Sequence, residues 1–180
     1  MSTHFSKHST LSKIALAASV LLASGASQAA DGTATATGTV VTPIAIATAA
    51  NLNFGSFAAG AGGTITVSTS GARTATGVVP IASTTTTAAR FNVTGTASST
   101  YSIVHAGTAV LTNTTGAGET MTLTKFSDLT AGNAVAGNVA SGTLDAGGTQ
   151  SIYVGGQLAV AANQAPGIYT GTVIATVEYN

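Results

Sequence analysis

Hydrophobic and polar residues alternate with a period of two in many short runs beyond residue 30. Successive side chains of a β-strand point to opposite faces, so this alternation predicts strands that bury one face. No stretch beyond residue 30 sustains the 3.6-residue period of an amphipathic helix. The predicted strands cover residues 33–41, 44–48, 64–69, 77–82, 88–94, 101–105, 120–126, 151–154, 157–161 and 168–179.

Clusters of Gly, Asn, Ser and Asp separate these runs, for example at residues 58–63, 114–118 and 131–142. Many short strands between regular turns are typical of a sandwich or barrel, and we predict an all-β, immunoglobulin-like antiparallel β-sandwich over residues 49–180. Aromatic residues make up only 5% of the chain, so the core is lean and a missing strand would matter. The predicted core comprises Leu52, Phe54, Phe57, Ile65, Val67, Phe91, Val93, Tyr101, Ile103, Leu111, Met121, Leu123, Phe126, Ile152, Val154, Leu158, Val160, Ile168, Val173 and Val177.

The first 29 residues have the three parts of a secretory signal peptide. Lys7 and Lys13 supply the positive region, residues 14–23 supply the apolar region, and residues 27–29 supply a cleavage site of small residues. The alternative is a membrane anchor, but the apolar run is shorter than the roughly 18 residues that a spanning helix needs. We therefore expect export, to the periplasm, the cell surface or the medium, and no transmembrane span after signal removal.

Charge is scarce in the 180-residue chain, because only 6% of the residues are charged. Beyond residue 29 three basic and five acidic side chains remain, which leaves nothing to follow a phosphate backbone, and we expect no nucleic-acid partner. A surface of Thr, Ser, Ala and Gly resists self-association poorly. The sequence holds no cysteine, so burial and backbone pairing must hold the fold, alone or with a partner strand.

Residues 33–41 form an alternating run directly after the expected cleavage site. One face carries Ala34, Ala36, Gly38 and Val40, and Pro43 interrupts any pairing just beyond. Two interpretations stay open: an ordinary first strand, or a donor segment that pairs with a neighbouring subunit. We define residues 30–48 as an N-terminal strand or candidate donor extension.

Residues that could carry catalysis are scarce. His105 is the only histidine beyond the signal, and a lone histidine in a strand is typical of a structural or solvated residue. Asp128 and Asp145 lie in separate predicted loops, where a weak calcium site is the alternative to a structural role. No hydrolase G-x-S-x-G motif, phosphate-binding loop or cluster of metal ligands is present in the sequence. We expect no enzyme activity, no cofactor and no metal.

The longest uninterrupted alternation closes the sequence, at residues 167–180. One face carries Gly167, Tyr169, Gly171, Val173, Ala175, Val177 and Tyr179. A long, apolar, uncharged edge strand is an aggregation hazard that proteins keep mainly when another chain adds to it. The run resembles the C-terminal β-zipper of chaperone–usher pilus subunits, which has a penultimate Tyr and a Gly fourteenth from the end. The resemblance implies that a periplasmic chaperone grips this face.

A second resemblance covers nearly all of the chain after residue 40. The matching pieces are residues 41–44 (VTPI), 52–55 (LNFG), 91–95 (FNVTG), 101–103 (YSI), 121–126 (MTLTKF), 154–158 (VGGQL) and 166–171 (PGIYTG). They resemble the DUF4402 family of bacterial secreted domains, which is distantly similar to pilin-like Csu and spore-coat-U domains. Two features differ from pilins: no disulfide can form, and residues 33–41 carry small side chains where donor strands usually carry bulky ones.

Together these features predict an exported structural subunit of a fimbria-like or cell-surface assembly, built by β-strand addition. Its expected partners are itself or related subunits, and a periplasmic chaperone. The alternative is a secreted monomeric binding module, lectin-like or matrix-associated, with a self-complete sandwich. Sugar sites usually present exposed Trp or Tyr, and the sequence holds no Trp.

Overall fold

The computed structural model describes residues 28–180, and within this range the chain forms strands and no helix. All strand pairs are antiparallel, so the prediction of an all-β antiparallel sandwich is confirmed. The strands are β1 (Ala45–Ala50), β2 (Phe57–Ala58), β3 (Gly63–Val67), β4 (Arg73–Thr76), β5 (Val79–Pro80), β6 (Ala89–Thr94), β7 (Thr100–Gly107), β8 (Val110–Asn113), β9 (Thr120–Asp128), β10 (Ser141–Thr143), β11 (Thr149–Val160), β12 (Tyr169–Thr170) and β13 (Val173–Tyr179). Within residues 28–180 no helix is long and apolar enough to cross a membrane.

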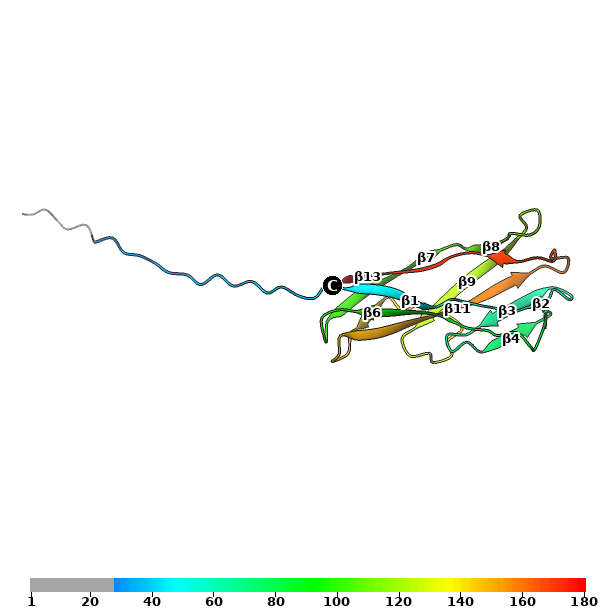
Figure 1. Cartoon of the computed structure of the whole chain (residues 1–180), viewed down its shortest axis with the longest axis horizontal. Helices are drawn as coiled ribbons and strands as arrows, with labels where there is room; N and C mark the ends of the chain where they lie inside the picture. Colours follow the sequence, from blue (N-terminus) through cyan, green and yellow to red (C-terminus); the bar gives the residue numbers. More distant parts are fainter. Residues whose placement is uncertain (1–27) are drawn as a thin grey trace, which may run out of the picture. The chain divides into compact units, whose positions relative to one another are not determined.

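The strands form one large sheet and two small ones (Figure 1). The large sheet has the order β1-β6-β11-β9-β8-β12, and the C-terminal half of β11 also pairs with β3, which pairs with β4. The second sheet has the order β10-β7-β13, and β2 pairs with β5. The long strand β11 therefore organises the large sheet, since it pairs with β9 on one side and with β6 and then β3 on the other.

The core has two halves. The first lies between β6 and β11 of the large sheet and β7 and β13 of the three-stranded sheet, and it includes Phe91, Tyr101 and Ile152. The second is built from β3, β9 and the C-terminal half of β11, and it includes Ile65, Leu123 and Leu158. The three-stranded sheet covers only the first half, whereas partly buried side chains such as Leu52, Phe57 and Tyr169 pack against the second half.

Several predicted strands change their bounds. The two runs at 151–154 and 157–161 form the single strand β11, because Gly155 and Gly156 continue the strand where the sequence indicated a turn. The last run divides into β12 and β13 at residues 171–172. The predicted strand at residues 77–82 is wrong: β4 ends at Thr76, and only the two-residue β5 falls within that range.

The predicted strand at residues 33–41 is also wrong for the free chain. Residues 28–43 carry no regular secondary structure, and every one of them is exposed. An alternating run forms a strand only when a neighbouring edge accepts its hydrogen bonds, and here the first pairing begins at Ala45. The expected signal peptide falls on residues 1–29, of which residues 1–27 lie outside the described part of the chain.

Candidate functional site

The sandwich is open along one seam, between β1 and β13. Within the described residues β1 pairs only with β6 and β13 pairs only with β7, so each strand has an edge without a strand partner. The two strands lie side by side at the end of the domain where the C-terminus lies, and the segments that continue them diverge toward the opposite end (Figure 1). We call this opening, between residues 48–59 and residues 164–173, the seam groove.

The backbone groups of the last fourteen residues point alternately to the paired side and to the open side of the seam. The paired side is fixed by three hydrogen bonds to β7 and to the residues directly after β7 and β8: the Ile168 carbonyl accepts from Thr114, the Thr172 carbonyl accepts from Thr108, and the Asn180 N–H donates to Thr100. In antiparallel pairing every second residue directs both of its backbone groups to the same neighbour. The odd-numbered residues therefore direct theirs to the open side. They are Gly167, Tyr169, Gly171, Val173, Ala175, Val177 and Tyr179, which are the seven residues that the sequence predicted for a pairing edge.

The side chains of the same odd-numbered residues point inward. Ala175 is buried, and Val173, Val177 and Tyr179 pack against the first core half. Tyr169 packs against the second half. The outward face of the strand leaves Ile168 and Ile174 exposed, so the prediction of Ile168 as a core residue is wrong.

The seam groove has a volume of about 1190 Å³ and an apolar floor. The floor is the second core half, and its lining side chains, such as Phe54, Met121 and Leu158, are buried. Four residues predicted as core are only half-buried and line the groove: Leu52, Phe57, Leu111 and Val173. Among the described residues, no Asp, Glu, Lys, Arg or His lines it. The groove therefore suits an extended, uncharged, apolar occupant.

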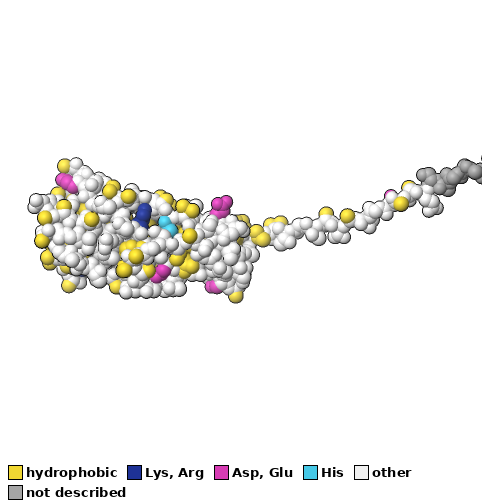
Figure 2. Space-filling view, turned by 180° about the vertical axis from the view of Figure 1, so that it is seen from behind, with side chains coloured by type: hydrophobic (Ala, Val, Ile, Leu, Met, Phe, Trp, Pro, Cys, Tyr) yellow, Lys and Arg dark blue, Asp and Glu magenta, His cyan; other side chains and the backbone are white. Residues whose placement is uncertain are grey.

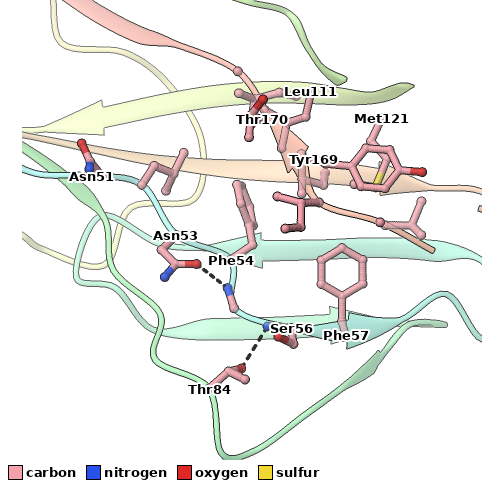
Figure 3. A pocket seen from close by; sticks show the side chains of 18 of the residues that line it. Asn51, Asn53, Phe54, Ser56, Phe57, Thr84, Leu111, Met121, Tyr169 and Thr170 are labelled. Carbon is pink, nitrogen blue, oxygen red and sulfur yellow. Dashed lines mark hydrogen bonds between the residues drawn. The ribbon is translucent and has the colours of Figure 1, made fainter. Parts of the chain in front are cut away.

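One rim of the seam groove is held by Arg73 of β4. Its guanidinium donates to the carbonyl oxygens of Phe54 (3.1 Å), Ser56 (3.2 Å) and Ile81 (2.9 Å), and to the Thr84 hydroxyl (3.3 Å). Thr84 in turn accepts from the Ser56 N–H, and Asn53 accepts from the Gly55 N–H (Figure 3). Figure 3 shows Phe54 and Phe57 pointing from this rim toward Leu111, Met121 and Tyr169 on the other side. A single arginine thus fixes the carbonyl-rich rim.

The opposite rim is held by side-chain amides. Gln164 donates to the Tyr169 hydroxyl (2.8 Å), which donates to the Ala165 carbonyl (2.7 Å). The buried amide of Asn113 donates to Glu119 (3.0 Å), and a Cβ at Gly167 would overlap the Asn113 side chain. A glycine at position 167 therefore allows the rim to pass close to Asn113.

Tyr179 closes the narrow end of the seam. Its hydroxyl donates to the Thr42 carbonyl (2.8 Å) and accepts from the Thr96 N–H (2.6 Å), and the Thr42 N–H donates to the Thr96 hydroxyl (3.0 Å). We call this set of contacts between Thr42, Thr96 and Tyr179 the root clasp, because it anchors the point where the chain enters β1. The resemblance to pilins assigned Tyr179 to chaperone binding, and in the free chain its hydroxyl is engaged within the domain.

The candidate donor residues Ala34, Ala36, Gly38 and Val40 lie in the exposed segment before the root clasp. Val40 is 100% exposed, and a Cβ at Gly38 would meet no atom within 4 Å. The segment is thus available for pairing, and the structure places no partner on it within the described residues.

His105 lies away from the groove, on β7. Its Nε2 lies 3.1 Å from the Val139 carbonyl and 3.0 Å from the Ser127 hydroxyl, while its buried Nδ1 has no partner within the described residues. Burial lowers the pKa of His105 below its ordinary value, the hydrogen bond to Val139 opposes this, and the charge of Lys125 adds to it. The imidazole ties the loop before β10 to β7, which is a structural role.

The two aspartates of the predicted loops close turns. Burial would raise the pKa of Asp128, but its hydrogen bonds from the Thr69 hydroxyl and three backbone N–H groups outweigh burial and lower the pKa. Hydrogen bonds from Thr149 and Gly147 lower the pKa of Asp145. Within residues 28–180 no group of His, Cys, Asp or Glu side chains is arranged to hold a metal ion.

Residues 44–179 match a protein family described as Domain of unknown function (DUF4402). The chain belongs to this family. The DUF4402 domain thus covers every strand described above, and the exposed segment before the root clasp lies outside the match. The chain matches no curated protein.

Sequence reasoning missed the rim residues of this DUF4402 domain. Arg73, Thr84 and Gln164 lie in turns or short strands with no alternation around them. No local signal marks Arg73, because Arg90, which also has no nearby carboxylate in sequence, is exposed on β6.

Proposed function

We propose that the protein is an exported structural subunit of a fimbria-like or cell-surface assembly, in which β-strands of neighbouring subunits complete one another. In this proposal the seam groove accepts a strand, and residues 30–41 are the segment offered to a neighbour. The observation that carries the proposal is the coincidence of open backbone groups at Gly167, Tyr169, Gly171 and Val173 with an uncharged groove that has an apolar floor.

A strand suits the groove better than a small molecule does. The odd-numbered residues from Gly167 to Val173 present N–H and C=O groups in a row, and a strand satisfies such a row while its alternate side chains fill the floor. Pockets for small ligands are usually about 300–1,000 Å³ and enclosed, with few polar groups. The secreted monomeric binding module, our alternative from sequence, would leave this edge unpaired in its working state.

The donor segment and the wide part of the seam groove lie at opposite ends of the seam, which favours an open-ended assembly. The root clasp lies at the narrow end of the seam, whereas Phe57 and Gly167 line the groove toward its wide end. A donor leaving one end and an acceptor open at the other make a head-to-tail contact. Such contacts produce filaments when the rotation between copies does not close a ring.

The narrow end leaves no room for an inserted strand. Some Cα atoms of β1 and β13 lie within 8 Å of each other, whereas two strands that flank a third lie about 9.6 Å apart, which is twice the usual spacing. An incoming strand therefore fits only beyond this point, beside residues 167–173. This part of the seam is also where the groove lies over the second core half.

The test compares two lysine substitutions on β8. Leu111 lines the groove, while Val110 is its neighbour on the opposite face of the strand and is 38% exposed. In exporting cells we expect heat-sensitive, high-mass species that contain the chain on non-boiled gels. L111K should lose these species and V110K should keep them, with folding of both checked by circular dichroism. Finding only monomer of the unsubstituted chain in the cells that naturally export it, where its partners are present, would refute the proposal.

A further inference from the structure

The seam groove and the exposed segment of this chain do not fit each other in size. We infer that the strand that fills the groove belongs to a different protein, is uncharged, and carries bulky apolar side chains at alternate positions. This inference rests on the proposed function, and it adds that the chain does not build a polymer from its own copies alone.

The groove is large, at about 1190 Å³, and it leaves apolar side chains half-buried. Its floor of Phe54, Met121 and Leu158 is buried, whereas Leu52, Phe57 and Leu111, which pack over this floor, are only half-buried. Protein interiors are packed as densely as organic crystals, and unfilled space beside apolar side chains is destabilising. An occupant that buries these three side chains must therefore present apolar groups large enough to reach them.

The exposed segment carries side chains that are too small or too polar for this groove. On one face Ala34 and Ala36 each offer a single methyl group, and Gly38 offers none. The opposite face carries threonines, whose hydroxyl groups would be buried against an apolar floor without hydrogen-bond partners. Neither face of the segment can both fill the groove and satisfy its own polar groups.

The large side chains of that segment lie at its anchored end. Val40 and Val41 directly precede Thr42, which the root clasp holds to Thr96 and Tyr179. They are thus at the anchored end of the segment, where it has the least freedom to enter a neighbouring domain. In contrast, Ala34, Ala36 and Gly38 are farther from the anchor, and they carry the smallest side chains.

The partner strand follows from the lining. Since no charged side chain lines the groove, a charged residue at an inward position would be buried without a counter-ion. Inward residues of a strand recur about every 6.6 Å, so an occupant with Val, Ile, Leu or Phe at each second position matches the row of open backbone groups. The small-residue segment of this chain is then suited to a shallower groove on another subunit.

The test is a gain of assembly. In the full chain, A36I/G38I places two isoleucines on the face of Val40, and the control A36I/T37I places the same two isoleucines on opposite faces. We expect the unsubstituted chain and the control to stay monomeric by light scattering, and A36I/G38I to form heat-sensitive oligomers. As a second readout, a synthetic peptide of residues 30–41 with A36I/G38I should raise the melting temperature of the chain by at least about 3 °C. The unsubstituted peptide and the A36I/T37I peptide should not.

The outcomes separate this inference from the proposed function. If the unsubstituted chain forms the same oligomers, or its own peptide raises the melting temperature as much, a second copy fits the groove: the inference is then wrong and the proposed function stands. If both isoleucine variants assemble equally, alternation does not select the occupant, and the inference is also wrong. If no peptide binds and no variant assembles, the groove accepts no strand, and both proposals fail.

Discussion

The imidazole of His105 is partly buried and its Nδ1 has no partner among the described residues, so burial disfavours its protonated form in the folded chain. Its pKa in the fold lies below the ordinary value of 6.5, which the unfolded chain retains. As the pH falls below 6.5, the unfolded chain binds a proton that the folded chain resists, so the free energy of unfolding decreases. Stability is therefore retained above this pH and declines below it.

The measurement is urea denaturation between about pH 7 and about pH 5, the range in which histidine titrates. H105Q keeps an N–H donor for the Val139 carbonyl but does not titrate, so the decline in this range should shrink. The lowered pKa values of Asp128 and Asp145 act in a separate range, below their ordinary value of 3.8. An unchanged decline in H105Q would assign it to another group.

Tyr179 joins three parts of the chain through one hydroxyl group. Removing it in Y179F leaves the Thr96 N–H and the Thr42 carbonyl without their partner. Because the site is only partly buried, we expect a loss of about 1 kcal/mol in the free energy of unfolding, measured by urea denaturation. The control is Y153F, since the Tyr153 hydroxyl makes no hydrogen bond within the described residues. An equal effect of both substitutions would show that the root clasp does not stabilise the fold.

At the scale of the element, the backbone of β13 allows a prediction that can be tested on the free chain, without a partner strand. The amides of Ile174 and Thr176 donate toward β7, while those of Val173, Ala175 and Val177 face the seam. In hydrogen-exchange measurements by NMR, the odd-numbered amides should therefore exchange faster than their even-numbered neighbours. Protection of all five amides in the free chain would mean that the edge is already covered.

The strand β11 depends on its two central glycines. A Cβ at Gly155 would overlap the Phe126 ring and the Val67 carbonyl oxygen. G155A should therefore lower the free energy of unfolding by about 1–3 kcal/mol, as overpacked cores do. G38A is the matched control, because nothing lies within 4 Å of a Cβ there and its unfolding should be unchanged. Equal stability of G155A and the unsubstituted chain would show that the atoms around position 155 shift to accommodate a Cβ.

These elements show what alternation can predict. It identified the strands that bury one face, such as β6 and β13, because burial is what produces the pattern. It failed for residues 33–41, which have the pattern without an edge to pair with, and for β11, where two glycines indicated a turn. It also predicted Leu52, Leu111 and Val173 as core, and the structure shows them half-buried along the seam groove. The groove itself follows from which edges meet, and no local pattern encodes this.

At the scale of the whole molecule, surface charge contributes little to how copies meet. Figure 2 shows charged side chains only as isolated points on the face that it displays. Long-range attraction or repulsion between copies is therefore weak, and association depends on short-range pairing and apolar burial. Changes in salt concentration should affect assembly less than the loss of a single apolar contact in the groove.

The division of the chain separates folding from assembly. Val40–Asn180 form one compact unit, and residues 30–39 are all exposed. Deleting residues 30–39 keeps the root clasp, so the melting temperature should stay within about 1 °C of the unsubstituted value, as expected when no buried contact is removed. Extending the deletion through Thr42 removes the carbonyl that accepts from Tyr179 and should lower it. If the segment is the part offered to a neighbour, the shortened chain can accept a strand but cannot offer one, so the mass of the heat-sensitive species in exporting cells should fall. Species of unchanged mass would show that the segment is not the donor, whereas a large drop in the melting temperature of the shortened chain would show that the segment belongs to the fold.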